Sequence, residues 1–291
     1  MPKAWNLLSF LLLSALLGAC DIINPSEPIP SYISIDKIEF VDSANNRKGA
    51  LNEQIISDAW VFVDNKFVGA FELPAKFPVL DEGNATIRVE SGIVQNGIKA
   101  TRGIFPFFKT NVIEGNLIPG ETLAITANTD YLDNLNFRFR EDFEDPSVKI
   151  DSVKGSAAGL KRTDDPDHVF PDGGSFSGFI TLTGDQVYAE IANIEEFKLP
   201  LGGQPAYLEI NYKTTSEFFV GLYINTQSDF LQFTKIGLAP KAEWNKIYID
   251  FTEEATTQTS DTRFQVFFVF PRKEGDPPLT TYLDNIRMVT F

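Results

Sequence analysis

The chain has 291 residues, of which 43% are hydrophobic and 13% aromatic, with 26 phenylalanines. This is enough apolar material for one large core or two ordinary ones, and we expect two domains. Acidic residues outnumber basic ones 40 to 25, for a formal net charge of −15. An acidic surface repels phosphate backbones, which argues against nucleic acid as a partner. One cysteine and one histidine exclude a disulfide framework and a multi-histidine zinc site.

The first 20 residues have the pattern of an export signal. Lys3 is followed by an apolar run over residues 7–17, too short to cross a bilayer, and then by small residues and Cys20. The motif LGAC that ends at Cys20 resembles the lipobox of bacterial, Bacteroidetes-like lipoprotein precursors. The resemblance implies that residues 1–19 are a signal peptide and that Cys20 is lipidated. We therefore predict a protein anchored by lipid in a Gram-negative envelope, at the outer membrane, on a side that the sequence leaves open.

Residues 20–32 hold the lipidated cysteine and a proline-rich tether, which we expect to be extended. Residues 33–134 show short alternating runs separated by Gly, Asn and Pro clusters, and no helix of useful length fits. Asp64 and Asn65 provide the tight turn of a hairpin. This region resembles the small Ig-like sandwiches of the PEGA or carboxypeptidase-regulatory type. The resemblance implies a spacer or adhesion role and carries over no functional residue.

Residues 135–291 contain further strand candidates at a spacing of about ten residues, which is typical of a β-sandwich or jelly roll. The predicted strands cover residues 176–183, 207–213, 218–225, 230–235, 246–251, 264–270 and 282–291. The motifs EDFED, GGSFSGFI, EWNKIYIDF and YLDNI follow one another here. Their order and spacing resemble carbohydrate-binding modules of the galactose-binding-like jelly-roll class. The predicted fold is therefore all-β, with a small Ig-like or PEGA-like sandwich followed by a jelly roll.

The resemblance also implies a metal site. In such modules an acid of the first strand and the aspartate of the last often share a structural calcium ion, and carboxylates suit calcium as hard oxygen ligands. The candidate ligands are Glu144 and Asp284, with Asp142 and Asp172 as further candidates. The alternative is that these acids are solvated at strand ends. No other cofactor is expected.

Sugar recognition needs flat aromatic faces with polar groups beside them. On the strand over residues 207–213, Tyr207 and Asn211 share a polar face opposite apolar residues. On the next strand, Tyr223 and Asn225 share a face. We predict these four as candidate glycan-binding residues; the alternative for each aromatic residue is a place in the core.

The sequence offers little support for catalysis. It contains no nucleophile elbow, phosphate loop or dinucleotide fingerprint, and no pair of carboxylates stands out for glycoside hydrolysis. The leading hypothesis is a lipid-anchored, noncatalytic envelope protein whose jelly roll binds glycan. The alternative is a structural subunit of an envelope assembly or secretion complex that contacts other proteins. A glycoside-acting enzyme ranks last.

Overall fold

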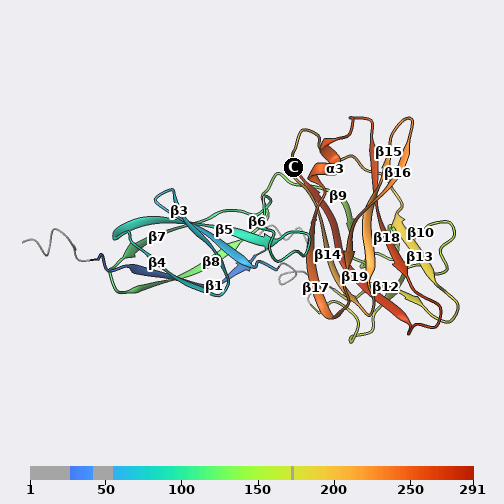
Figure 1. The fold of residues 1–291 in the computed structure, drawn as a ribbon, viewed down its shortest axis with the longest axis horizontal. Coiled ribbons are helices and arrows are strands. Elements are labelled where there is room, and N and C mark those ends of the chain that lie inside the picture. Colours follow the sequence, from blue (N-terminus) through green and yellow to red (C-terminus); the bar gives the residue numbers. More distant parts are fainter. Residues whose placement is uncertain (1–26, 42–54, 172–173) are drawn as a thin grey trace, which may run out of the picture.

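The computed structural model describes residues 27–41, 55–171 and 174–291. They form two β-sandwiches that follow one another along the long axis of the molecule (Figure 1). The predicted all-β class is therefore confirmed. The described residues contain a single short helix, α3 (Thr252–Thr256). None of their helices is long and apolar enough to cross a membrane.

The first sandwich contains two sheets. One has the order β4-β1-β8 and the other the order β3-β2-β5-β6, with β7 also paired to β5. The strands are β1 (Ser31–Phe40), β2 (Asp58–Val63), β3 (Lys66–Glu72), β4 (Ala75–Val79), β5 (Gly83–Val94), β6 (Arg102–Ile104), β7 (Asn111–Leu117) and β8 (Thr122–Thr129).

The predicted hairpin joins β2 and β3. Val63 pairs with Lys66, so only Asp64 and Asn65 form the turn. Both turn residues have positive φ, 47° and 65°. A two-residue turn of this kind matches the right-handed twist of its strands, and Asn and Asp tolerate the conformation better than most residues. The local sequence thus determined this part of the first sandwich.

The second sandwich also has two sheets. The first has the order β11-β12-β19-β14-β17, with β9 also paired to β19, and the second has the order β10-β13-β18-β15-β16. The strands are β9 (Asn136–Glu141), β10 (Ile150–Ser152), β11 (Lys161–Thr163), β12 (Ser177–Leu182), β13 (Tyr188–Asn193), β14 (Ala206–Thr214), β15 (Phe218–Asn225), β16 (Phe230–Leu238), β17 (Lys241–Asp250), β18 (Arg263–Pro271) and β19 (Leu279–Thr290).

Each sandwich has its own hydrophobic core between its sheets. Ile33, Val61 and Ile87 are fully buried in the first, and Leu222 and Phe268 are fully buried in the second. Side chains alternate between the faces of a strand, so these apolar positions fix which face of each strand points inward. The residues between them face outward, where a binding surface has to be built.

A third apolar cluster joins the two sandwiches. It contains residues of the first sandwich and of the segment that follows it, together with outward-facing residues of β14, β17 and β19: Phe40, Ile93, Phe105, Phe107, Phe108, Tyr131, Tyr207, Tyr248 and Val289. We call this set the interdomain cluster. Its rings pack mostly edge to face, as Phe105 does against Tyr207, with ring centroids 5.4 Å apart.

Hydrogen bonds reinforce the interdomain cluster. The Tyr131 hydroxyl donates to both carboxylate oxygens of Glu209, at 2.5 and 2.7 Å. Gln95 Nε2 donates to the Tyr207 hydroxyl at 2.6 Å. The first sandwich and the segment after it therefore cover part of the β14–β17–β19 surface. The sheet β10-β13-β18-β15-β16 lies on the opposite side of the second sandwich, away from the first (Figure 1).

Candidate functional site

The outer face of the sheet β10-β13-β18-β15-β16 combines aromatic and polar side chains. On β15, Leu222 is in the core, so alternation turns Gly221 and Tyr223 outward. A side chain at Gly221 would collide with the ring of Phe267, because an added Cβ would lie 2.5 Å from that ring. The glycine thus leaves room for this ring and for the backbone carbonyl of Phe233 on β16, which an added Cβ would also meet.

The aromatic rings on this face are layered. Phe267 is fully buried and stacks on Tyr223, with ring centroids 4.8 Å apart and planes inclined by 29°. Phe230 follows on β16, with its centroid 5.1 Å from that of Tyr223. Phe230 is 62% exposed. The stack therefore leads from a buried ring to one that is open to solvent.

A polar network surrounds Glu190 on β13. Its Oε1 accepts hydrogen bonds from the Tyr223 hydroxyl at 2.5 Å and from Gln232 Nε2 at 2.6 Å. Its Oε2 accepts one from the Tyr188 hydroxyl. β13 and β16 are separated by two strands, which is about 14 Å on a flat sheet. Glu190 and Gln232 nevertheless touch, because their long side chains reach toward one another across this face, which is hollowed.

The concave face forms a groove of about 460 Å³, within the usual size range of ligand sites. Its walls and floor include Asp151, Glu190, Ala192, Tyr223, Phe230, Gln232 and Gln265. Burial, together with the neighbouring Glu190 carboxylate, raises the pKa of Tyr188 to about 12. The same causes raise the pKa of Tyr223. Both phenols therefore stay protonated near neutral pH and keep donating to Glu190.

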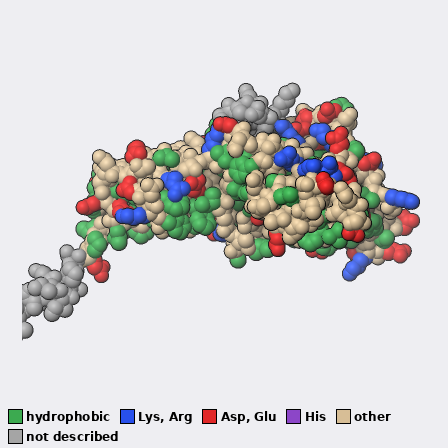
Figure 2. Space-filling view, turned by 90° about the horizontal axis from the view of Figure 1, so that it is seen from above, with side chains coloured by type: hydrophobic (Ala, Val, Ile, Leu, Met, Phe, Trp, Pro, Cys, Tyr) green, Lys and Arg blue, Asp and Glu red, His purple; other side chains and the backbone are tan. Residues whose placement is uncertain are grey.

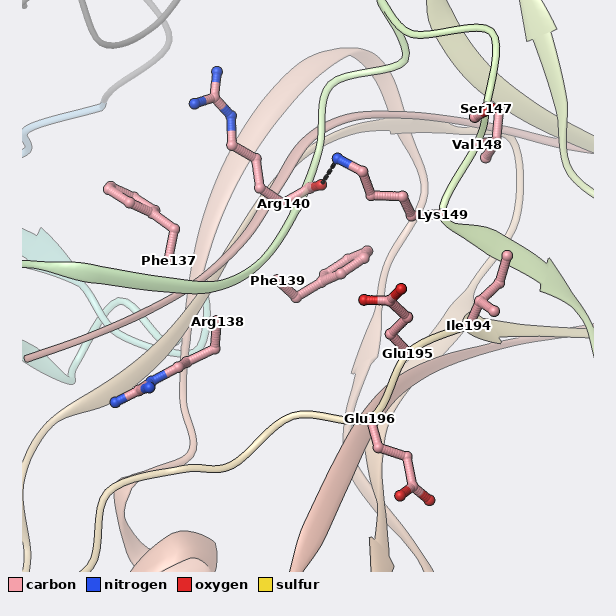
Figure 3. A pocket seen from close by; sticks show the side chains of 10 residues that line it. All are labelled: Phe137, Arg138, Phe139, Arg140, Ser147, Val148, Lys149, Ile194, Glu195 and Glu196. Atoms are coloured by element: carbon pink, nitrogen blue, oxygen red, sulfur yellow. Dashed lines mark hydrogen bonds between the residues drawn. The ribbon is translucent and has the colours of Figure 1, made fainter.

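A second hollow, of about 470 Å³, lies beyond Ile194, which lines both. Figure 3 shows that its charged groups do not converge, because Arg138 and Arg140 point to opposite sides of β9. Lys149 Nζ donates to the Arg140 carbonyl at 3.0 Å, and Arg140 pairs with Asp142 at 3.1 Å. Because these cations point to different places, they do not form a shared binding site for an anion in this hollow.

Tyr207 and Asn211 require a correction. Both face outward from β14, as alternation predicted, but they are 4% and 2% exposed. Tyr207 belongs to the interdomain cluster, and Asn211 Oδ1 accepts a hydrogen bond from Lys246 at 3.2 Å. The prediction that these two residues contact a glycan is therefore wrong, because neither has a surface to offer.

Tyr223 and Asn225 lie on the free sheet. Tyr223 lines the groove, although its ring is largely covered. Asn225 is half-buried, pairs with Phe230 on the neighbouring strand, and donates to Glu196 Oε1 at 2.9 Å. The structure thus separates the four predicted residues into a covered pair and a pair at or beside the groove. Whether the second pair binds a glycan stays a prediction.

The predicted calcium ligands have protein partners. Asp284 is fully buried and accepts hydrogen bonds from Ser177 Oγ and from the Asn285 amide. Glu144 Oε1 accepts two backbone N–H groups. Within residues 27–41, 55–171 and 174–291, no three or more His, Cys, Asp or Glu side chains form a group that could hold a metal ion.

Asp172 lies outside the described residues, so the calcium site stays a prediction. A rise in melting temperature on adding calcium, lost in Asp284→Ala, would support it; the same melting temperature with and without calcium would reject it. Cys20 and the signal peptide also lie outside the described residues.

Sequence reasoning missed most of the groove. Glu190 lies on β13, which was not among the predicted strands, and Phe230 and Gln232 lie on a predicted strand but were not singled out. The sequence signal that could have identified Phe230 and Gln232 is their spacing of two residues on β16, which places both side chains on one face of the strand. The pairing of these residues with Tyr223 and Asn225 depends on the order of strands in the sheet.

Comparison with protein-family models gives no match, and neither does comparison with curated proteins. Among solved structures, the chain is similar to a family 11 carbohydrate-binding module from Clostridium thermocellum in complex with a β-1,3-1,4-mixed-linked tetrasaccharide. The identity is 14% and the TM-score 0.36, over 51% of this chain and 92% of the module.

Two further solved structures show a similar level of likeness. A variant of a family 29 carbohydrate-binding module complexed with mannohexaose is 12% identical, with a TM-score of 0.35, over 54% of this chain and 93% of that one. The enzymatically active domain of tailspike protein 4 from bacteriophage CBA120 is 12% identical, with a TM-score of 0.36, over 48% of this chain and 19% of that one.

Proposed function

We propose that the protein binds glycan, without transforming it, in the groove on the sheet β10-β13-β18-β15-β16. The observation that carries this proposal is the concave face itself, where the exposed ring of Phe230 stands beside the polar network of Glu190. A pyranose ring has an apolar C–H face that packs against an aromatic ring and hydroxyls at its edge that bond to fixed polar groups.

The placement of the acids in the groove supports binding over hydrolysis. It contains two carboxylates, Asp151 and Glu190, on neighbouring strands of one concave face and not on opposite walls, whereas glycosidases place their two acids on either side of the bond. Both oxygens of Glu190 accept hydrogen bonds from tyrosine hydroxyls of the protein itself. The one histidine, His168, stacks on Tyr282 of the other sheet, with ring centroids 4.7 Å apart.

We further infer that the protein is a lipoprotein, anchored at the outer membrane through Cys20, with the first sandwich as a spacer. The sheet that carries the groove lies on the side of the second sandwich away from the first (Figure 1), which suits a module presented away from its anchor. Cys20→Ser should abolish lipid labelling and leave an unprocessed precursor. Normal processing of this variant would reject the anchor.

The function is tested by affinity electrophoresis of the full-length protein against a panel of plant and microbial polysaccharides. We expect slowed migration in at least one gel. Ala192→Trp fills the groove floor, since Ala192 is 7% exposed and lies beside Phe267 on the neighbouring strand, and should restore free migration. Ala70→Trp, at an exposed position of the first sandwich, is the matched control and should migrate like the wild type.

Absence of retardation in every gel would reject glycan binding. Equal retardation of wild type and a folded Ala192→Trp variant would place the site elsewhere. The same incubations, analysed for reducing ends, test the noncatalytic part of the proposal. Release of oligosaccharides that depends on Glu190 would show an enzyme.

One observation favours the second candidate, a subunit of an envelope assembly. Apolar side chains also reach the surface of the first sandwich, where Phe67 is 53% exposed and Val112 is 60% exposed. Phe67 stacks on Trp60 with centroids 5.6 Å apart, and Figure 2 shows hydrophobic side chains gathered on a face of this sandwich. Such surfaces serve protein contacts. A complex in envelope cross-linking that is lost in Phe67→Glu and kept in Ala192→Trp would support this candidate.

A further inference from the structure

Several side-chain donors of the groove already form hydrogen bonds within the protein. Gln232 and Tyr223 donate to Glu190, at 2.6 and 2.5 Å. Gln265 Nε2 donates to the Asn193 carbonyl at 2.6 Å. These bonds leave the groove richer in acceptors than in donors.

The rest of the lining continues this pattern. The Asn193 side-chain amide donates to the Glu195 carbonyl, and Ser152 Oγ donates to Asp151 Oδ1 at 3.3 Å. Among the described residues, the groove is lined by the carboxylates of Asp151 and Glu190 and by no Lys, Arg or His. A ligand can bond here by donating its hydrogen atoms to carboxylate and amide oxygens.

We propose that the groove selects glycans without anionic groups, recognised mainly through the hydrogens of their hydroxyls. This inference rests on the glycan-binding function proposed above and names the class of ligand. A sugar hydroxyl can donate to the acceptors of the groove, whereas a uronate or sulfate group can only accept hydrogen bonds. Such a group would also face the like charges of Asp151 and Glu190 in a partly desolvated site.

Two cations of the neighbouring hollow do not offset these charges. Arg140 and Lys149 line the hollow beyond Ile194 and do not line the groove. In Figure 3 the guanidinium of Arg140 points away from Ile194, and Lys149 reaches toward the Arg140 carbonyl. An anionic substituent bound in the groove would therefore meet carboxylates and no counter-charge from this pair.

The test compares matched ligands with the full-length protein. Soluble mixed-linkage β-glucan, β-mannan and β-galactan are each paired with a derivative whose C6 hydroxyls have been oxidised to carboxylates. We expect the neutral form of any polysaccharide that binds to bind at least tenfold more tightly than its oxidised form, a difference of about 1.4 kcal/mol. The gap should narrow as salt is added, because ions screen the repulsion.

Substitutions separate the groove from the net charge of the protein. Asp151→Asn should reduce the ratio of neutral to oxidised affinity at least threefold. Glu82→Gln makes the same change in net charge at an exposed position of the first sandwich and should leave the ratio unchanged. A ratio that shifts equally in both variants would show that overall charge, and not the groove, excludes anions.

The outcomes also distinguish this inference from the function on which it rests. Equal or tighter binding of the oxidised forms, lost in Ala192→Trp, would overturn the selection for uncharged glycans while leaving glycan binding in place. No binding to either form, or to any polysaccharide of the wider panel, would overturn both.

Discussion

Replacing Phe230 by alanine should weaken glycan binding about tenfold. A phenylalanine has about 200 Å² of surface to bury, so a ring that is 62% exposed leaves about 120 Å² open. A sugar stacked on one face covers about half of this, or 60 Å². At about 25 cal/mol per Å², the lost contact is worth about 1.5 kcal/mol, which corresponds to slightly more than a tenfold change in Kd.

Isothermal titration calorimetry with the polysaccharide that the panel identifies measures this change. The matched control is Phe67→Ala, which removes a ring that is 53% exposed from the first sandwich and should leave Kd unchanged. Both rings are largely solvated, so neither variant should lower the melting temperature appreciably. A Phe230→Ala variant that binds within twofold of the wild type would refute the assignment of this ring as the sugar platform.

Two further predictions concern stability. Burial and Glu190 raise the pKa of Tyr188 to about 12, above the value of about 10 in an unfolded chain. The protonated phenol therefore contributes its full stabilisation below pH 10, and this stabilisation is lost as the pH rises toward 12. The free energies of unfolding of wild type and Tyr188→Phe, measured with denaturant, should converge over this range, and a constant difference would contradict the prediction. Lys246→Met removes the ammonium that lies 3.1 Å from buried Glu209 and should lower the free energy of unfolding by about 3 kcal/mol. Adding Glu209→Gln should recover most of that loss. A double variant as unstable as the single one would contradict the ion-pair explanation.

The strands and their faces were largely predictable from the sequence. Each predicted strand of the second sandwich overlaps an observed one, and β15 spans the predicted residues, Phe218–Asn225. Alternation also placed Tyr207 and Tyr223 on outward faces correctly. These outcomes depend on local periodicity, which apolar and polar residues encode within a few positions.

The groove was less predictable because it depends on distant parts of the chain. β13, with the sequence YAEIAN, has few β-branched or aromatic residues to mark it as a strand. Glu190 meets Gln232 although 42 residues separate them. Only the strand order of the sheet brings them together, and this order cannot be read from the periodicity of a single strand.

The two outward faces of the second sandwich show why a polar, aromatic strand face is an ambiguous signal. On β14, Tyr207, Glu209 and Asn211 look like a binding surface in sequence, yet every one is buried. There Glu209 contacts Lys246, and Tyr131 donates to its carboxylate, which compensates for burying the charge. On the opposite sheet, Glu190 is likewise hydrogen-bonded, but Phe230 beside it is left open. The carboxylate of each face is satisfied by its own chain, so the two faces differ in whether the neighbouring aromatic ring is covered: Tyr207 is buried, whereas Phe230 is open to solvent.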